Sequence, residues 1–279
     1  MESVPALFQV YRLALAEGMI TIFSTPKPFN DSQNRRERNF RNAVGSWQEL
    51  RPKPEIAIFG GERVIVEELG AKWIMATPSN KNGLPYIDGM FALAQSMAHN
   101  DILMFANDDM VFLPDLVRAV YSAASRFKSF LMIGQRWDVD VPDRVDFGSR
   151  GWEQQLRSQV IRHGRLHPVH GKDYFVFRRP LGLNVPPLLV GRPQWDNWMV
   201  SHALGAGIPV IDASLAVTAI HQNHDYSHNP GGVHITVSRC DEFLYNIKLG
   251  SHWGHISDAT WTMSAQGEIY RRGTDEWNR

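Results

Sequence analysis

The stretch that decides the fold is Asp101-Ile102-Leu103-Met104-Phe105-Ala106-Asn107-Asp108-Asp109. Residues 102–106 are all apolar, which is typical of a central strand that is covered on both faces. The polar triplet 107–109 follows at once, and residues 110–113 are apolar again. Because ligands of open α/β sheets collect at the carboxyl ends of the strands, two adjacent carboxylates stand where a ligand is expected.

Adjacent aspartates repel each other, so this position favours a ligand that offsets their charge. A divalent cation bound through oxygen does so, and Mg²⁺ or Mn²⁺ commonly completes its shell with substrate phosphates. The structural alternative is a turn in which Asn107 and the aspartates bond to nearby backbone ahead of a helix. The place of the triplet, directly after the predicted central strand, favours the metal site.

Strand-like and helix-like segments alternate on both sides of this stretch. Strands are expected at 19–23, 55–59, 73–77, 101–106 and 130–134, with helices at 34–50, 64–69, 86–99 and 116–127. This β-α-β-α order predicts an α/β sheet with helices on both faces. After residue 135 the rhythm loosens, with helices expected at 151–162, 194–204 and 241–249 and strands at 174–177, 209–211 and 217–220.

The composition excludes several classes of protein. The 279 residues contain 29 Lys and Arg and 29 Asp and Glu, so the chain lacks the broad basic face of a nucleic-acid binder. Cys240 is the only cysteine, which excludes an intrachain disulfide and predicts a reducing, cytoplasmic location. No apolar run approaches the roughly 20 residues of a membrane span, although peripheral membrane association remains compatible with the sequence.

The order of these features resembles that of the GT-A-type glycosyltransferases, in particular family 2. The resemblance rests on a first strand ending in Ser24-Thr25-Pro26, a second ending in Gly60-Gly61-Glu62, the helix at 86–99 and the triplet 107–109 in place of a DxD motif. It implies a single GT-A-like domain over residues 1–279, with a mixed, mostly parallel central sheet flanked by helices. The nucleotide-binding half would span about 19–134, the acceptor half about 135–235, and a C-terminal extension 236–279.

The resemblance assigns roles in the nucleotide-binding half. Asp109 matches the metal-binding position of the motif, Asp108 the middle position, and Asn107 the ribose-side position, where the family normally has Asp. The remaining residues expected to contact the nucleotide are Thr25, Pro26 and Lys27 at the base and ribose, Glu62 at the base, and Arg41 at a phosphate. Thr25-Pro26 could instead only end a strand, and Arg41 could lie on a solvated helix face.

In the acceptor half, Asp196 stands at the start of a predicted helix between Trp195 and Trp198. The two tryptophans are three residues apart and so share one side of the helix, where they are either core residues or an aromatic surface for a sugar ring. Asp196 is either a carboxylate that interacts favourably with the positive end of the helix dipole or, by the resemblance to inverting enzymes, the base that deprotonates the acceptor. By the same resemblance, Asp173 is a candidate to bind a sugar hydroxyl, or it only starts the strand at 174–177.

Histidines gather in the second half of the chain, where the strand 217–220 delivers His221 at its end. The resemblance makes His221 the second metal ligand, with His224 as the alternative or as an acceptor-site residue. His221, His224 and Asp225 could also form a self-contained transition-metal site, although this spacing is too loose to indicate zinc. The cluster at His163, His167 and His170 has no assigned role.

Three functions follow in order of preference. The first is a metal-dependent glycosyltransferase that moves a sugar from a nucleoside-diphosphate sugar to a hydroxyl of a glycan or other acceptor, with inversion, Mn²⁺ or Mg²⁺ as cofactor and Asp196 as base. The second is a nucleotidyltransferase that makes a sugar nucleotide, although no Gly-rich run followed by a basic residue comes after the first strand. The third is a non-catalytic carbohydrate-binding protein that uses its tryptophan faces.

Overall fold

The computed structural model describes residues 20–29, 34–75, 77–224, 241–250 and 253–273. Its centre is a nine-stranded sheet in the order β13-β12-β10-β6-β9-β4-β1-β2-β3. Five of its eight strand pairings are parallel, while β9 runs antiparallel to both β4 and β6, and β13 antiparallel to β12. The strands are β1 (Ile20–Ser24), β2 (Glu55–Phe59), β3 (Lys72–Ile74), β4 (Ile102–Ala106), β6 (Leu131–Ile133), β9 (Tyr174–Arg178), β10 (Val210–Asp212), β12 (Trp261–Met263) and β13 (Ile269–Arg271).

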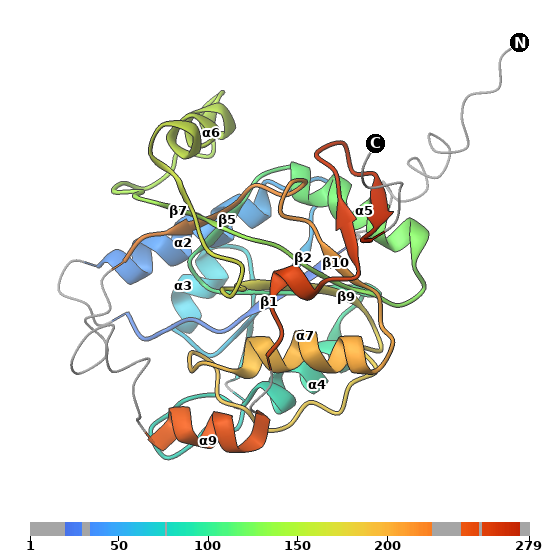
Figure 1. Cartoon of the computed structure of the whole chain (residues 1–279). Coiled ribbons are helices and arrows are strands. Elements are labelled where there is room, and N and C mark those ends of the chain that lie inside the picture. The colour runs from blue at the N-terminus through green and yellow to red at the C-terminus, as the bar shows by residue number, and fades with distance from the viewer. Residues whose placement is uncertain (1–19, 30–33, 76, 225–240, 251–252, 274–279) are drawn as a thin grey trace, which may run out of the picture.

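Helices cover both faces of this sheet (Figure 1). One apolar core contains residues of α2 (Arg35–Gln48), α3 (Arg63–Glu68) and α5 (Asp115–Arg126). The opposite core contains residues of α4 (Ile87–Met97) and α7 (Trp195–Gly205), and the latter contacts α9 (Asp241–Gly250). The expected fold class, an α/β sheet of mixed but mostly parallel strands flanked by helices, is therefore confirmed.

Strand β4 holds the two cores together because its side chains alternate between them. Ile102, Met104 and Ala106 belong to the core under α2 and α5, whereas Leu103 and Phe105 belong to the core under α4 and α7. All five side chains are buried. The uninterrupted apolar run is thus explained by a strand that has no solvent-facing side, and its carboxyl end carries the acidic triplet out of the core.

A second, four-stranded sheet in the order β5-β11-β7-β8 begins directly after the triplet. It consists of β5 (Met110–Phe112), β11 (Ala219–Gln222), β7 (Trp137–Val139) and β8 (Arg165–Leu166), with α6 (Trp152–His163) packed on it through a third apolar cluster. Figure 1 shows α6 at the outer edge of the molecule. The sequence predicts α6 and the apolar stretch of β5 but not β7 or β8, because two or three residues are too few for a visible period.

Several sequence-based expectations concern residues outside the described ranges. They include the first residue of the predicted strand 19–23, Asp225 and most of the loop that follows His224. Among the helices of the described ranges, none has the length and apolar character needed to cross a bilayer. The predicted strand 217–220 is shifted along the chain, since β11 runs from Ala219 to Gln222 and therefore includes His221 rather than ending before it.

The indole of Trp47 links α2 to the residue that follows the triplet. Trp47 is fully buried, and its Nε1–H donates to the Met110 carbonyl at 2.9 Å. Because Trp47→Phe leaves that buried carbonyl without its partner, we expect the free energy of unfolding to fall by about 1–3 kcal/mol, as measured by urea denaturation. Trp253→Phe, at a side chain that is 78% exposed, is the control and should change it by less than about 0.5 kcal/mol. Equal effects of the two substitutions would contradict this anchoring role.

Candidate metal centre

The backbone of the acidic turn is fixed by one hydrogen bond within the turn and by hydrogen bonds to three other segments. Asn107 N–H donates to the Asp173 carbonyl at 2.9 Å, and Met110 N–H closes the turn onto the Asn107 carbonyl at 3.2 Å. The Ser24 hydroxyl, at the end of β1, donates to the Ala106 carbonyl at 2.6 Å. Gln222 Nε2, at the end of β11, donates to the Asp109 carbonyl at 3.0 Å. The turn is therefore held by β1, β9 and β11 together.

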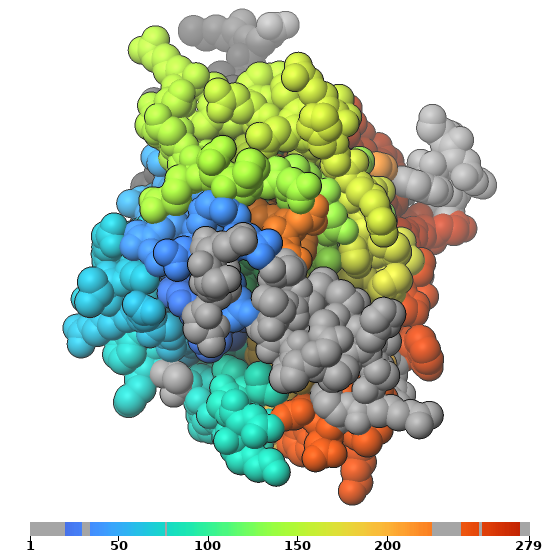
Figure 2. All heavy atoms as spheres, turned by 90° about the vertical axis from the view of Figure 1, so that its left-hand side faces the viewer, coloured from blue at the N-terminus to red at the C-terminus, as the bar shows by residue number. Residues whose placement is uncertain are grey.

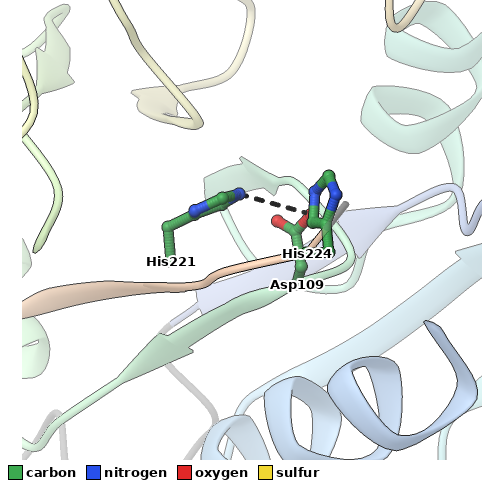
Figure 3. Close-up of side chains that lie close together, drawn as sticks. All are labelled: Asp109, His221 and His224. Atoms are coloured by element: carbon green, nitrogen blue, oxygen red, sulfur yellow. Dashed lines mark ion pairs between the residues drawn. The ribbon is translucent and has the colours of Figure 1, made fainter. Parts of the chain in front are cut away.

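Asp109, His221 and His224 converge in front of this turn, as Figure 3 shows. One ligand atom from each of the three lies within 4.8 Å of the others. His224 Nε2 is 3.2 Å and His221 Nε2 is 3.7 Å from Asp109 Oδ2. The two imidazoles thus approach the same carboxylate, which is the arrangement of a three-ligand metal site.

The state of Asp109 Oδ1 tests whether these residues fit a metal ion. Asp109 is only 4% exposed, and its Oδ1 is buried without a hydrogen-bond partner among the residues that the structure describes. An unpaired buried carboxylate oxygen is costly, and a cation is the partner that removes this cost. One oxygen and two imidazole nitrogens suit Mn²⁺ and related transition metals better than Mg²⁺, which prefers oxygen alone. The donor set therefore fits a divalent transition metal.

Lys27, just after β1, brings a second positive group to the turn. Its Nζ lies 3.3 Å from Asp109 Oδ2 and 3.9 Å from Asp108 Oδ1, and its backbone N–H donates to Asp108 Oδ2 at 2.9 Å. Burial alone lowers the pKa of Lys27, but Asp109 and Asp108 outweigh burial and raise that pKa. The sequence places Lys27 at the nucleotide, and the structure adds that its ammonium contacts both aspartates.

The pKa values of the two neighbouring aspartates are shifted in opposite directions. Burial raises the pKa of Asp109, yet the interactions with Lys27, His221 and His224 outweigh burial and hold that pKa well below its usual range. Burial also raises the pKa of Asp108, which Lys27 counters only in part and which the charge of Asp109 raises further. Asp109 is therefore the member of the pair that holds its negative charge more strongly, as a metal ligand must.

A polar network behind His221 was not recognised from the sequence. His221 Nδ1 lies 3.2 Å from Asp138 Oδ1, and Asp138 also accepts from Arg136 Nε at 2.9 Å. His167, left without a role in the sequence, places its Nδ1 2.8 Å from Asp138 Oδ2. Burial raises the pKa of Asp138, but its contacts with His221, His167 and Arg136 hold that pKa far below the usual range. The only signal in the sequence was an Arg-x-Asp pair just after the strand at 130–134.

The cluster stands between two hollows. On one side, a cavity of about 370 Å³ is walled by His221 and His224 toward the cluster and by residues of β7, β8 and the end of α6 elsewhere. On the other side, a narrower pocket is lined by both aspartates, Lys27, His224, Arg36 and Asn39. Figure 2 shows this face of the molecule, with N-terminal residues that include α2 in blue, residues next to the buried β11 in orange and the segment that contains α6 in yellow-green. Ligands on the two sides would meet at the metal.

The other residues assigned to the nucleotide lie at the strand ends or on the helices beside them. Thr25 donates through its hydroxyl to the Phe59 carbonyl at 2.9 Å, which ties the end of β1 to the end of β2. Pro26 packs against Gly61, where φ is +72° and an added Cβ would come within 2.5 Å of the proline ring. Glu62 is exposed at the start of α3. Their nucleotide contacts stay predictions.

Arg41 and Arg36 lie on the same helix but differ in their surroundings. Arg41 forms ion pairs with Glu37 at 2.7 Å and with Glu68 at 2.9 Å, which match the solvated-face alternative of the sequence analysis. Arg36 lines the narrow pocket beside the aspartates, and its Nη1 donates to the Pro28 carbonyl at 3.0 Å. Arg36 was not singled out from the sequence, because a helix with several arginines does not reveal which one faces the turn.

Asn107 and Asp173 pair with each other beside the metal cluster. Asn107 Nδ2 donates to Asp173 Oδ1 at 2.5 Å, and Arg136 Nη1 donates to Asp173 Oδ2. Both oxygens of Asp173 therefore already have donors, and a role toward a sugar hydroxyl stays a prediction. The pairing also suits an amide at position 107, since a carboxylate here would repel Asp173.

Trp195, Asp196 and Trp198 open α7 at the same edge of the sheet. Both tryptophans are buried, with Trp195 against Phe105 at 5.2 Å between ring centroids and Trp198 stacked on His202 at 3.8 Å. In these positions they are core residues, and their faces are not available to a sugar. Asp196 Oδ2 lies 3.2 Å from Nζ of Lys172, whose side chain is fully buried. The contact of Trp195 with Phe105 places the start of α7 close to the end of β4.

Comparison with known proteins yields similarity in structure only. No protein-family profile and no curated protein sequence matches the chain. One similar structure is glucosyl-3-phosphoglycerate synthase from Mycobacterium tuberculosis in complex with Mn²⁺, UDP and glucosyl-3-phosphoglycerate. It is 13% identical with a TM-score of 0.44, and the match covers 82% of this chain and 80% of that one.

Two further similar structures are the inositol-1-phosphate CTP transferase from T. maritima and S. aureus TarS 1–349. The first is 13% identical with a TM-score of 0.38, and the match covers 83% of this chain and 97% of that one. The second is 11% identical with a TM-score of 0.33, and the match covers 46% of this chain and only 39% of that one. These similarities concern the GT-A-like fold alone, and the site must be interpreted from its own residues.

Removing the Asp109 carboxylate tests the metal centre directly. We expect Asp109→Asn to abolish Mn²⁺ binding in isothermal titration calorimetry, because a neutral amide neither attracts the cation nor replaces the buried charge. His221→Ala and His224→Ala should each weaken binding. Asp101→Asn, at the opposite end of β4 where Asp101 pairs with Arg179 at the surface, is the matched control and should bind Mn²⁺ like the unaltered protein. Unchanged binding by Asp109→Asn would exclude this site.

Proposed function

We propose that the protein is a metal-dependent glycosyltransferase that moves a sugar from a nucleoside-diphosphate sugar to a hydroxyl of a glycan or other acceptor, with inversion. One observation carries the proposal: Asp109, His221 and His224 converge at the carboxyl end of the central strand, and one buried oxygen of Asp109 has no partner among the described residues. This is where ligands of α/β sheets bind. The single cysteine suits a cytoplasmic location for the reaction.

Asp109, His221 and His224 would hold Mn²⁺ in preference to Mg²⁺, because two of the three donor atoms are imidazole nitrogens. When bound, the ion offsets the negative charge that develops on the diphosphate as the sugar leaves. Lys27 and Arg36 line the pocket on one side of the cluster and supply further positive charge for phosphate oxygens. The donor nucleotide would therefore lie on the side of β1 and α2.

A second space beside the cluster is the cavity beyond His221. Its volume of about 370 Å³ falls within the usual range of small-molecule sites, so it can receive the sugar or the acceptor. Asp196, at the head of α7 and not among the residues that line this cavity, would take the proton of the attacking hydroxyl. The buried ammonium of Lys172 holds this carboxylate in place at 3.2 Å. The sugar–phosphate bond then breaks as the bond to the acceptor oxygen forms, which inverts the anomeric centre.

The two alternatives receive less support from the residues present. A carbohydrate-binding protein would need accessible aromatic faces, whereas Trp195 and Trp198 are about 5% and 4% exposed. A nucleotidyltransferase would release pyrophosphate from a nucleoside triphosphate, whereas a glycosyltransferase releases a nucleoside diphosphate. The products distinguish these two reactions.

A thermal-shift screen of nucleoside diphosphates with and without Mn²⁺ identifies the donor base. We expect one diphosphate to raise the melting temperature strongly only when Mn²⁺ is present, because metal and phosphates share one site. The matching nucleotide sugars are then assayed for release of diphosphate. Stabilisation by nucleoside triphosphates with pyrophosphate release would favour the nucleotidyltransferase, and stabilisation by glycans alone would favour the binding protein.

Asp196→Asn tests the base. We expect kcat for sugar transfer to fall by about 10²–10⁴-fold, while the Mn²⁺-dependent affinity for the nucleoside diphosphate stays within a factor of two or so of the unaltered value. The control is Asp258→Asn, in the short helix Ile256–Asp258. The neighbouring Asn197 is unsuitable for a control, because it accepts a hydrogen bond from Lys172. Transfer at the full rate by Asp196→Asn would assign the base to another residue.

A further inference from the structure

Asp138 stands beside His221 because of strand register. In the parallel pairing of β11 with β7, His221 is the direct partner of Asp138. On its other side, β11 pairs His221 with Met110, the residue after Asp109. Partners in register point to the same face of a sheet, so the fold itself places a carboxylate next to the imidazole that approaches Asp109.

The two nitrogens of His221 face two different carboxylates. Nε2 is 3.7 Å from Asp109 Oδ2, and Nδ1 is 3.2 Å from Asp138 Oδ1. The second pair is at ion-pair distance, while the ring is turned out of line for a well-formed hydrogen bond, so that Nδ1 has no aligned acceptor among the described residues. A small rotation of the ring brings the Nδ1–H onto Asp138, and Nε2 then carries the lone pair that a metal requires.

Asp138 is itself held on several sides. Arg136 Nε donates to its Oδ1 at 2.9 Å, and His167 Nδ1 lies 2.8 Å from its Oδ2. Arg136 also donates to Asp173, which accepts from Asn107 in the acidic turn. The contacts therefore form a closed path. It runs from Asp109 through His221 and Asp138 to Arg136, and from there through Asp173 back to Asn107. Such a closed path fixes the carboxylate relative to the turn.

We propose that Asp138 is the positioning residue of the metal centre: it holds His221 with the proton on Nδ1 and the Nε2 lone pair directed at the ion. The inference rests on the proposed metal site, but not on sugar transfer. Metal-ligating histidines commonly donate their second N–H to a carboxylate, which fixes the tautomer and raises the basicity of the ligand. Asp138 would act through His221 and not as a ligand of the ion. Arg136 and His167 keep the Asp138 carboxylate oriented.

Asp138→Ala tests the proposal, with Asp140→Ala as the matched control two residues along the chain. Asp140 is exposed and accepts from Asn223 Nδ2 at 2.8 Å, so its loss removes a carboxylate without touching His221. Mn²⁺ affinity is measured by electron paramagnetic resonance, and folding by the melting temperature without metal. We expect Asp138→Ala to bind Mn²⁺ about 10- to 100-fold more weakly, and Asp140→Ala to bind it as the unaltered protein does. Asp138→Asn and Asp138→Glu, which keep an acceptor, should fall between.

A second measurement does not depend on the metal. In ¹⁵N-histidine spectra at about pH 8, where imidazoles are neutral, the signal of His221, identified by its absence in His221→Gln, should show the Nδ1–H tautomer. Asp138→Ala, which has no acceptor, should lose this preference. Asp138→Asn, whose amide oxygen is a neutral and weaker acceptor, should reduce it and keeps the test available if the alanine variant does not fold.

The outcomes separate this inference from the proposed function. Weaker Mn²⁺ binding and a lost tautomer preference support the role of Asp138 even if the protein transfers no sugar. A tautomer population that is unchanged in both Asp138→Ala and Asp138→Asn, or Mn²⁺ affinity of Asp138→Ala within about twofold of the control, would overturn it. If the unaltered protein binds no Mn²⁺, or binds it no better than Asp109→Asn does, both proposals are overturned together.

Discussion

The rest of the site depends on one buried carboxylate. Asp109 follows the central strand and is only 4% exposed. Its negative charge would cost several kcal/mol at this buried position if it were not compensated. The compensation comes from segments far apart in the chain: Lys27 after β1, and His221 and His224 at the end of β11. The strand arrangement therefore also has an electrostatic effect, since it brings the positive and imidazole groups to the end of β4.

The acidic turn is rigid because it joins two sheets. Strand β4 ends in the nine-stranded sheet at Ala106, and β5 begins in the four-stranded sheet at Met110. The turn between them cannot move without displacing one of the two sheets. Gln222 reinforces the junction, because its amide donates to the carbonyls of Asp109 and Asn39 and so connects β11, the turn and α2. A metal site on such a junction is preorganised, which is what a binding site needs.

The main sheet and the acidic turn could be predicted because their signals are local. An apolar run of five residues can only be a buried strand or helix segment, and the polar triplet after it marks the strand end. His221 was likewise recognisable at the end of an apolar strand, although β11 begins and ends two residues later than expected. For Trp195 and Trp198 the sequence left two alternatives, core residues or a surface for a sugar ring, and the structure places both side chains in the core.

The contacts that complete the site could not be predicted, because they depend on pairing between distant segments. Strand β7 has three residues, Trp137 to Val139, and nothing in so short a segment shows that Asp138 will pair with His221. Arg36 and Arg41 are both basic residues of one helix, and only the packing of α2 decides that Arg36 lines the pocket while Arg41 binds glutamates. Register and helix rotation are global properties of the fold.

The charge count connects the neutral composition of the chain with the proposed donor. Counted formally, Asp108 and Asp109 carry two negative charges and Lys27 one positive charge, which leaves one negative charge at the turn. A divalent ion changes this to one positive charge, and Arg36 adds another on the same side. Metal binding then favours anion binding at the turn, because the ion changes the formal charge beside the phosphate from one negative charge, or from zero when Arg36 is counted, to a positive value. A protein of zero net charge can in this way bind a diphosphate at one point without a basic surface, and the two ligands stabilise each other's binding.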